Sequence, residues 1–282
     1  RWMLALSAPR VHAVNAHYYR KLELDAKTFT QSRSVIERAL RGGKHLTRVE
    51  LASVLRKAGI SAKGPRLAYL MMHAELEAAI CSGARRGKQF TYALLDERVP
   101  RARTMKRDDA LAELTRRYFS SRAPATLRDY VWWSGLTVRE ARIGIDLLKP
   151  LLAEEMVRGR TYLCIPSAAG KRHDSRAVYL LPNYDELGIA YKDRDVIPEV
   201  RRPPLLSARD EFPHLLLIDG HPVGRWRRTI KGGTVVVEVQ PFKSLDASER
   251  RSLDIAAARH GRFMNMPVTV SSVDGRPRHR TA

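Results

Sequence analysis

Two stretches of this 282-residue sequence carry the same series of helix start and stop signals, and this repeat restricts the possible folds most. Thr47 and Glu50 have the spacing of a capping box, in which each side chain satisfies a free amide at a helix start. Gly59 ends that helix, and a second helix begins near Pro65, whose missing amide costs nothing there. A strand, a basic turn over residues 83–88 and another strand follow, so this stretch predicts a helix-turn-helix with a β-hairpin wing.

The second copy lies 76 to 79 residues further along. Thr126 opens a helix that Gly135 ends, and Thr137 with Glu140 forms another capping box before a hairpin over residues 154–165. Amphipathic lead helices are expected around 34–40 and 106–119. In the first copy, apolar residues at helical spacing predict a buried stripe formed by Leu67, Leu70, Met71, Ala74 and Ala78. The chain therefore predicts tandem winged-helix modules.

Winged helices place one helix in the major groove of DNA and touch the backbone or minor groove with the hairpin, although some dock proteins instead. With 51 Lys and Arg against 30 Asp and Glu, the formal charge is +21, which suits a polyanion. We therefore expect binding to double-stranded DNA. The candidate contacts lie at the two recognition helices and the two basic hairpin tips: Lys63, Arg66, Arg85, Arg86, Lys88, Arg139, Arg142, Arg158 and Arg160.

The last third of the chain changes pattern from helical to alternating apolar residues. Strands are expected over 212–218, 223–229, 234–239 and 267–270, with a tight turn at Asp219-Gly220 and a helix from Asp246 to about His260. The strand hairpin adds four candidate DNA contacts around Trp226: Arg225, Arg227, Arg228 and Lys231. A solvated basic face over a core tryptophan is the competing interpretation.

The expected fold class is α+β, with tandem winged-helix modules followed by a small β-rich C-terminal domain. The predicted divisions are a remnant of a preceding N-terminal module (1–29), a winged-helix module (30–100), a second one (101–168), an α+β domain (169–273) and a disordered tail (274–282).

Several function classes are excluded by what the sequence lacks. No apolar run reaches membrane-span length and no secretory signal is visible, so a cytoplasmic, nucleoid-associated protein without membrane contact is expected. Cys81 and Cys164 are far apart and lack a histidine at metal-ligand spacing, so both are predicted to be small buried side chains. We expect no metal and no cofactor.

A polar segment precedes the strands of the last third. Asp185 and Glu186 are adjacent carboxylates that could hold a metal or act as acid and base. They could equally cap a helix start, as acidic side chains often do. Tyr184, Asp185, Glu186, Tyr191 and Arg194 are therefore kept as a possible site.

Taken together, seven segments resemble the YcaQ/AlkZ family of bacterial winged-helix DNA glycosylases. The segments are RWMLALSAPR at 1–10, LTRVEL at 46–51, WWSGLT at 132–137, LPNYDE at 181–186, YKDR at 191–194, DG at 219–220 and GRWR at 224–227. They occur in the family's order over nearly the whole chain. The resemblance implies an enzyme that holds damaged duplex DNA and hydrolyses the bond to an alkylated base, including bases in interstrand crosslinks. Water attacks the sugar carbon as the cationic base leaves.

The sequence departs from this family in one respect. The family's catalytic Gln-x-Gln or Gln-x-Asp signature lies upstream of the matching segment, and Gln31, Gln89 and Gln240 show no such spacing. No catalytic residue is therefore carried over. We expect a parent glycosylase of which this chain, inactive by itself, is a truncated part. A non-catalytic regulator or architectural DNA-binding protein is the alternative, and a monomer suffices for either.

Overall fold

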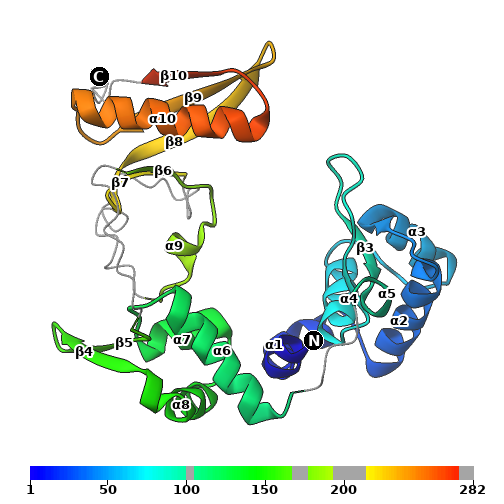
Figure 1. The fold of residues 1–282 in the computed structure, drawn as a ribbon. Coiled ribbons are helices and arrows are strands. Elements are labelled where there is room, and N and C mark those ends of the chain that lie inside the picture. The colour runs from blue at the N-terminus through cyan, green and yellow to red at the C-terminus, as the bar shows by residue number, and fades with distance from the viewer. Residues whose placement is uncertain (100–104, 167–176, 193–213, 273–282) are drawn as a thin grey trace, which may run out of the picture. The chain divides into compact units, whose positions relative to one another are not determined.

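The computed structural model describes residues 1–99, 105–166, 177–192 and 214–272. The chain divides into two compact units, Arg1–Ile165 and Pro166–Ala282. Both helices and sheets are present, which confirms the α+β class (Figure 1). No described helix has the length and hydropathy needed to cross a membrane.

The first module follows the predicted order and adds a short strand. Helix α1 (Trp2–Lys21) precedes it, and the module itself comprises α2 (Ala26–Leu40), β1 (Leu46–Thr47), α3 (Arg48–Lys57), α4 (Pro65–Leu76), β2 (Ile80–Ser82), β3 (Thr91–Leu94) and the short α5 (Leu95–Arg98). The capping box at Thr47 is present, with both of its reciprocal hydrogen bonds. Helix α2 begins at Ala26, capped by Asp25, upstream of the module boundary predicted at residue 30.

The core of this module is the predicted apolar stripe of α4 packed against α2 and α3. Leu70, Met71 and Ala74 are buried against Ile36, Leu40, Leu51 and Leu55. The prediction for Ala78 is wrong: α4 ends at Leu76, and Ala78 adopts a left-handed φ of 55° in the turn before β2. Helical periodicity extends through this turn in the sequence, but the chain must reverse there to begin the wing.

The second module repeats the plan with α6 (Arg107–Ser121), α7 (Leu127–Ser134), α8 (Val138–Leu147), the 3-10 turn η1 (Lys149–Leu151), β4 (Ala153–Val157) and β5 (Arg160–Cys164). Capping boxes at Thr126 and Thr137 and the left-handed cap at Gly135 confirm the sequence signals. The residue before the first capping threonine pairs with the wing in both modules: Leu46 with Tyr92, and Ala125 with Leu163. This shared pairing was not predicted.

An aromatic core holds α6, α7 and α8 together. Tyr118, Phe119 and Tyr130 are fully buried, and the hydroxyl of Tyr130 lies 2.8 Å from Oγ1 of Thr115. Burial raises the pKa of Tyr130 to about 12, so it stays protonated. Gly144 of α8 faces Thr115 at a point where a Cβ atom would overlap the threonine hydroxyl. The close approach of α6 and α8 therefore depends on this glycine.

The second unit is a five-stranded sheet with one long helix against it. Its elements are β6 (Val178–Leu180), α9 (Glu186–Ile189), β7 (Leu215–Ile218), β8 (His221–Lys231), β9 (Thr234–Pro241), α10 (Ala247–Met264) and β10 (Val268–Ser272). The strand order is β10-β9-β8-β7-β6, with β10 parallel to β9 and the other pairs antiparallel. Asp219 and Gly220 both have positive φ in the turn that the sequence predicted. Strand β6 was not predicted, and α10 continues four residues past His260.

Candidate nucleic-acid interface

Helix α8 of the second module presents two unengaged arginines on one exposed face. Arg139 and Arg142 are one turn apart and exposed, and within the described ranges neither guanidinium has an ion pair or hydrogen bond. The intervening Glu140 is occupied, because it caps α8 through Thr137 and pairs with Arg107. The helix therefore offers an amino-terminal half whose free charge is positive, as contact with DNA requires.

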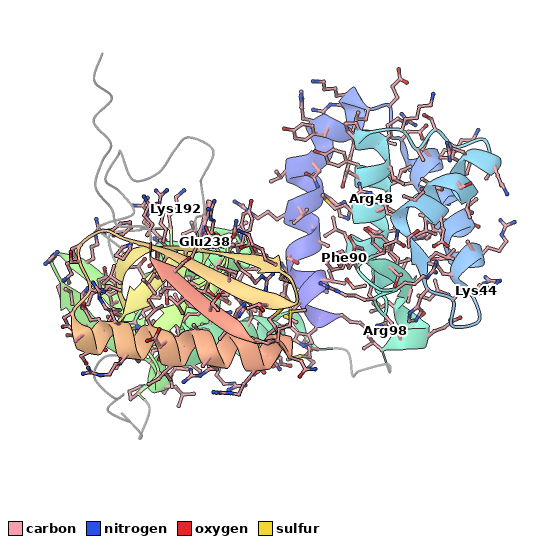
Figure 2. The ribbon with its side chains drawn as sticks, turned by 90° about the horizontal axis from the view of Figure 1, so that it is seen from above. Lys44, Arg48, Phe90, Arg98, Lys192 and Glu238 are labelled. Atoms are coloured by element: carbon pink, nitrogen blue, oxygen red, sulfur yellow. The ribbon has the colours of Figure 1, made fainter. Side chains whose placement is uncertain are left out.

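Helix α4 of the first module was expected to play the same part, but α1 covers it. Tyr18 stacks on Tyr69 with ring centroids 5.4 Å apart, and Asn15 donates to the sulfur of Met72 at 3.1 Å. Figure 2 shows α1 running alongside α4 in this unit. The middle of α4 is thus packed against protein, while Lys63, just before its first turn, is exposed.

The two candidate cations at the start of α4 have different surroundings. Lys63 is exposed, as expected. Arg66 is half-buried, and its guanidinium donates to the carbonyl of Leu22 and, at 3.2 Å, to that of Ser61. Arg66 therefore fixes the α1–α2 loop to α4, which makes it a weaker candidate for DNA contact than Lys63.

The tip of the first wing combines free cations with an exposed aromatic ring. Phe90 is 67% exposed, and the guanidinium carbon of Arg85 lies 4.3 Å from its ring centroid. Lys88 is exposed in the same turn, and within the described part of the chain its ammonium group forms no ion pair or hydrogen bond. An apolar ring beside cations is the combination that minor-groove proteins use to wedge between base steps. Arg85, Lys88 and Phe90 together form what we call the wing-1 tip.

Arg86, in the same turn, serves the fold instead. It donates to Oε1 of Glu50 at 2.8 Å and to the carbonyl of His45 at 2.6 Å. These bonds tie the wing to the start of α3, so the Arg86 guanidinium is engaged within the protein, and its predicted contact with DNA stays a prediction. The hydrogen bond from Arg86, followed by those from Thr47, lowers the pKa of Glu50 to about 2.

Replacing Arg86 by Gln is expected to raise the pKa of Glu50 toward its usual value of 4.5. Because the folded-state pKa is depressed, the associated stabilisation is present above the unfolded pKa and is lost as pH falls from about 4.5 to about 2. An NMR titration of the Glu50 carboxyl carbon measures both values. Lys88→Gln, in the same turn, is the control and should leave the titration midpoint of Glu50 unchanged. If the Glu50 titration midpoint is unchanged in Arg86→Gln, the hydrogen bond between Arg86 and Glu50 is not the cause of the low pKa.

Two exposed cations near this wing were missed by the sequence reasoning. Lys44 lies in the loop after α2, and Arg48 is the first residue of α3 (Figure 2). The sequence did offer a signal for them, because both flank the capping box at Thr47. The start of a helix attracts anions such as DNA phosphates, and nearby cations strengthen that attraction.

The second wing carries its cations at the predicted turn. Arg158 is exposed with φ of 50°, followed by Gly159 with φ of 73°, and Arg160 is exposed at the start of β5. All five residues of β4 are exposed, among them Glu154 and Glu155. This wing is therefore basic only at its tip.

The C-terminal hairpin supports the competing interpretation for its tryptophan. Trp226 is 8% exposed, its Nε1 donates to the carbonyl of Leu181 at 2.8 Å, and it packs against His214 and His260. Burial, with the charge of Arg228, lowers the pKa of both histidines, so both are neutral at pH 7. The ring is a core side chain and is not available to stack on a base.

The four cations of this hairpin are not equivalent. Arg227 pairs with Glu238 across the β8–β9 ladder, whereas Arg225 is half-buried. Arg228 and Lys231 are exposed, with Nη1 of Arg228 3.5 Å from the sulfur of Met264. Arg228 and Lys231 are the better candidates for phosphate contact.

The Asp185 segment behaves as a helix start. Oδ1 of Asp185 accepts the amide of Leu187 at 3.0 Å and caps α9, and Glu186 lies in the first turn. Tyr184 is 67% exposed with φ of 58°, and Tyr191 is half-buried. Arg194 lies outside the described residues, as does the tail predicted at 274–282.

One group of side chains has the composition of a metal site, although metal chemistry was set aside from the sequence. His12, His73 and Glu77 place one ligand atom each within 4.8 Å of one another. Positions 12 and 73 are too far apart in sequence to form a recognisable ligand motif. Cys81 and Cys164 are both half-buried free thiols, less buried than predicted.

Comparison with known proteins agrees with this architecture. The sequence model of a family described as DNA glycosylase AlkZ-like matches residues 1–263. The solved structure of Streptomyces sahachiroi DNA glycosylase AlkZ superposes with a TM-score of 0.67 at 18% identity, covering 95% of this chain and 76% of that one. A search of curated proteins finds no match. At this identity the structural likeness bears on the fold.

Proposed function

Since the chain belongs to the AlkZ-like family of DNA glycosylases, we propose that it holds damaged duplex DNA for the hydrolytic removal of alkylated bases. The observation that carries this proposal is the family match over residues 1–263, which spans both winged-helix modules and most of the C-terminal unit. The net charge of +21 agrees with a polyanionic substrate.

DNA contact in this proposal is made chiefly by α8 and the wing-1 tip. Arg139 and Arg142 contact phosphates beside the major groove from the exposed face of α8, and Arg85 and Lys88 contact phosphates from the wing-1 tip. Phe90 is placed to wedge against base steps, because an extruded base leaves a gap in the stack. Lys63, Arg158, Arg160, Arg228 and Lys231 add further positive charge along the backbone.

The reaction proposed is hydrolysis of the bond between the sugar and the damaged base. Water attacks the sugar carbon as that bond breaks, the base leaves with its electron pair, and the water loses a proton. An alkylated purine is already cationic, so the reaction needs little acid assistance. We assign no described side chain to the chemical step, and Tyr184, Asp185, Glu186 and Tyr191 are retained as a possible site only.

The test is a base-release assay on duplex DNA carrying N-methylated purines, with the protein as its gene encodes it. Release of free methylated base above a heat-inactivated control is expected. An intact crosslinked duplex, incubated in parallel, asks whether crosslinks are also unhooked. Tight duplex binding without any base release would overturn the glycosylase proposal and leave a DNA-binding protein.

The proposal also covers the oligomeric state and the cellular location of the protein. One chain with two modules makes adjacent DNA contacts without a partner subunit, so we infer that the protein acts as a monomer. We also place its action in the cytoplasm at the nucleoid, where a DNA-repair enzyme meets its substrate. Analytical ultracentrifugation of the protein with a short duplex should give a one-to-one complex.

A further inference from the structure

The interface between α1 and α4 brings together two imidazoles and one carboxylate. His12 lies on α1, while His73 and Glu77 lie one turn apart at the end of α4. Nε2 of His12 is 3.2 Å from Oε1 of Glu77, and the two imidazole centroids are 4.9 Å apart. Three groups from two helices therefore face one point.

The orientation of His12 does not fit a simple hydrogen bond to Glu77. Within the described part of the chain, Nε2 of His12 is a buried nitrogen without a hydrogen-bond partner, despite its 3.2 Å approach to Oε1. Two donor atoms that bind one Zn²⁺ at about 2.0–2.1 Å in tetrahedral geometry lie roughly 3.3 Å apart. The separation thus suits two ligands of a shared cation.

The surrounding side chains hold both imidazoles in place. Nδ1 of His12 lies 3.0 Å from the hydroxyl of Tyr19, which leaves Nε2 directed toward the cluster. Phe29 stacks on His73 with centroids 3.8 Å apart. A ligating histidine whose second nitrogen is hydrogen-bonded is the usual arrangement at zinc sites.

We propose that His12, His73 and Glu77 bind a zinc-type divalent cation that clips α1 onto α4. Imidazole nitrogens favour Zn²⁺ and similar transition metals over Mg²⁺ or Ca²⁺. Three protein ligands leave a fourth position for water. The cation would hold α1 against the face of α4 that it covers and so keep that face out of a DNA groove. This site is independent of the glycosylase proposal.

Cobalt titration of the metal-free protein tests the site, because tetrahedral Co²⁺ gives intense visible ligand-field bands. One equivalent is expected to produce them. His12→Gln and the isosteric Glu77→Gln should each weaken binding at least tenfold, and Tyr19→Phe, which removes the hydroxyl beside Nδ1 of His12, should weaken it about tenfold. His17→Ala, an exposed histidine on the same helix, is the matched control and should bind normally.

Thermal unfolding provides a readout that does not depend on spectroscopy. Free Zn²⁺ at a hundredfold excess over Kd should raise Tm by roughly 5 °C in the wild type and in His17→Ala, but not in Glu77→Gln. Circular dichroism establishes that each variant is folded. Absence of tetrahedral cobalt bands in the wild type, or equal loss in His17→Ala and His12→Gln, overturns the proposal.

Discussion

Replacing Arg139 and Arg142 together by Gln is expected to weaken duplex binding about a hundredfold at moderate salt. Each guanidinium is exposed and unengaged within the described structure, so each loss removes one charge-assisted contact worth about tenfold in affinity. The slope of log K against log salt concentration should fall by about two, because about one counterion is released per phosphate contact. Fluorescence anisotropy at several salt concentrations measures both quantities.

The control is Arg116→Gln with Arg117→Gln, which changes the net charge equally. Both arginines are held by Glu113 on α6, at 2.9 and 2.7 Å, and their hydrogen bonds lower the pKa of Glu113 to about 2. Exposed pairs of this kind contribute little to stability, so the control protein should fold normally. If the control weakens binding and lowers the salt slope as much as the α8 pair, the charge effect is nonspecific and α8 is not the contact.

Replacing Gly144 by Ala is expected to lower the free energy of unfolding of the first unit by about 2 kcal/mol. The added Cβ would overlap Oγ1 of Thr115 and approach the carbonyl of Leu111 to 3.2 Å, which overpacks the α6–α8 contact. Thr115→Ala alone should cost about 1–2 kcal/mol, because it removes the partner of the buried Tyr130 hydroxyl.

The double variant Gly144→Ala with Thr115→Ala distinguishes steric overlap from other causes. Removing the threonine hydroxyl makes room for the new methyl group, so the double variant should be at least about 1 kcal/mol more stable than the two single effects predict. Gly188→Ala in α9 of the second unit is the control for an added methyl group that meets no overlap, since nothing lies within 4 Å of its Cβ position, and it should leave the unfolding free energy of the first unit unchanged. Urea unfolding measures the stability of the four variants and the wild type. Equal stability of Gly144→Ala and Gly188→Ala would show that the helices do not depend on this glycine.

The predictions confirmed from sequence depend on signals between near neighbours. The capping boxes at Thr47 and Thr137, the helix start at Thr126, the left-handed Gly135 and the Asp219-Gly220 turn each involve residues at most three positions apart, so their geometry follows from local hydrogen bonding. The same residues give the order of helices and wings. Short pairings such as Leu46 with Tyr92 were missed because both partners are too brief to show strand periodicity.

The functional surface was harder to predict, because the accessibility of a cation depends on distant residues. Arg66 and Arg86 resemble Arg85 and Arg139 in sequence context, yet the first two are engaged by partners 44 and 36 positions away. The burial of the Trp226 ring could likewise not be predicted from its neighbours in sequence, because it depends on a hydrogen bond to Leu181, 45 positions away.

The repeated winged-helix plan, the α+β class and the positive charge could be predicted from the sequence, since each follows from local spacing or composition. Which helix remains exposed depends on tertiary packing. Helix α1 packs over α4 through rings and polar groups more than 40 residues apart, whereas Arg139 and Arg142 of α8 stay unengaged in the described structure. Tertiary packing also brings His12 to His73 and Glu77. Packing between segments distant in sequence leaves no periodic pattern in the sequence, because the spacing of apolar residues in each segment reflects the geometry of its own helix and does not identify the partner.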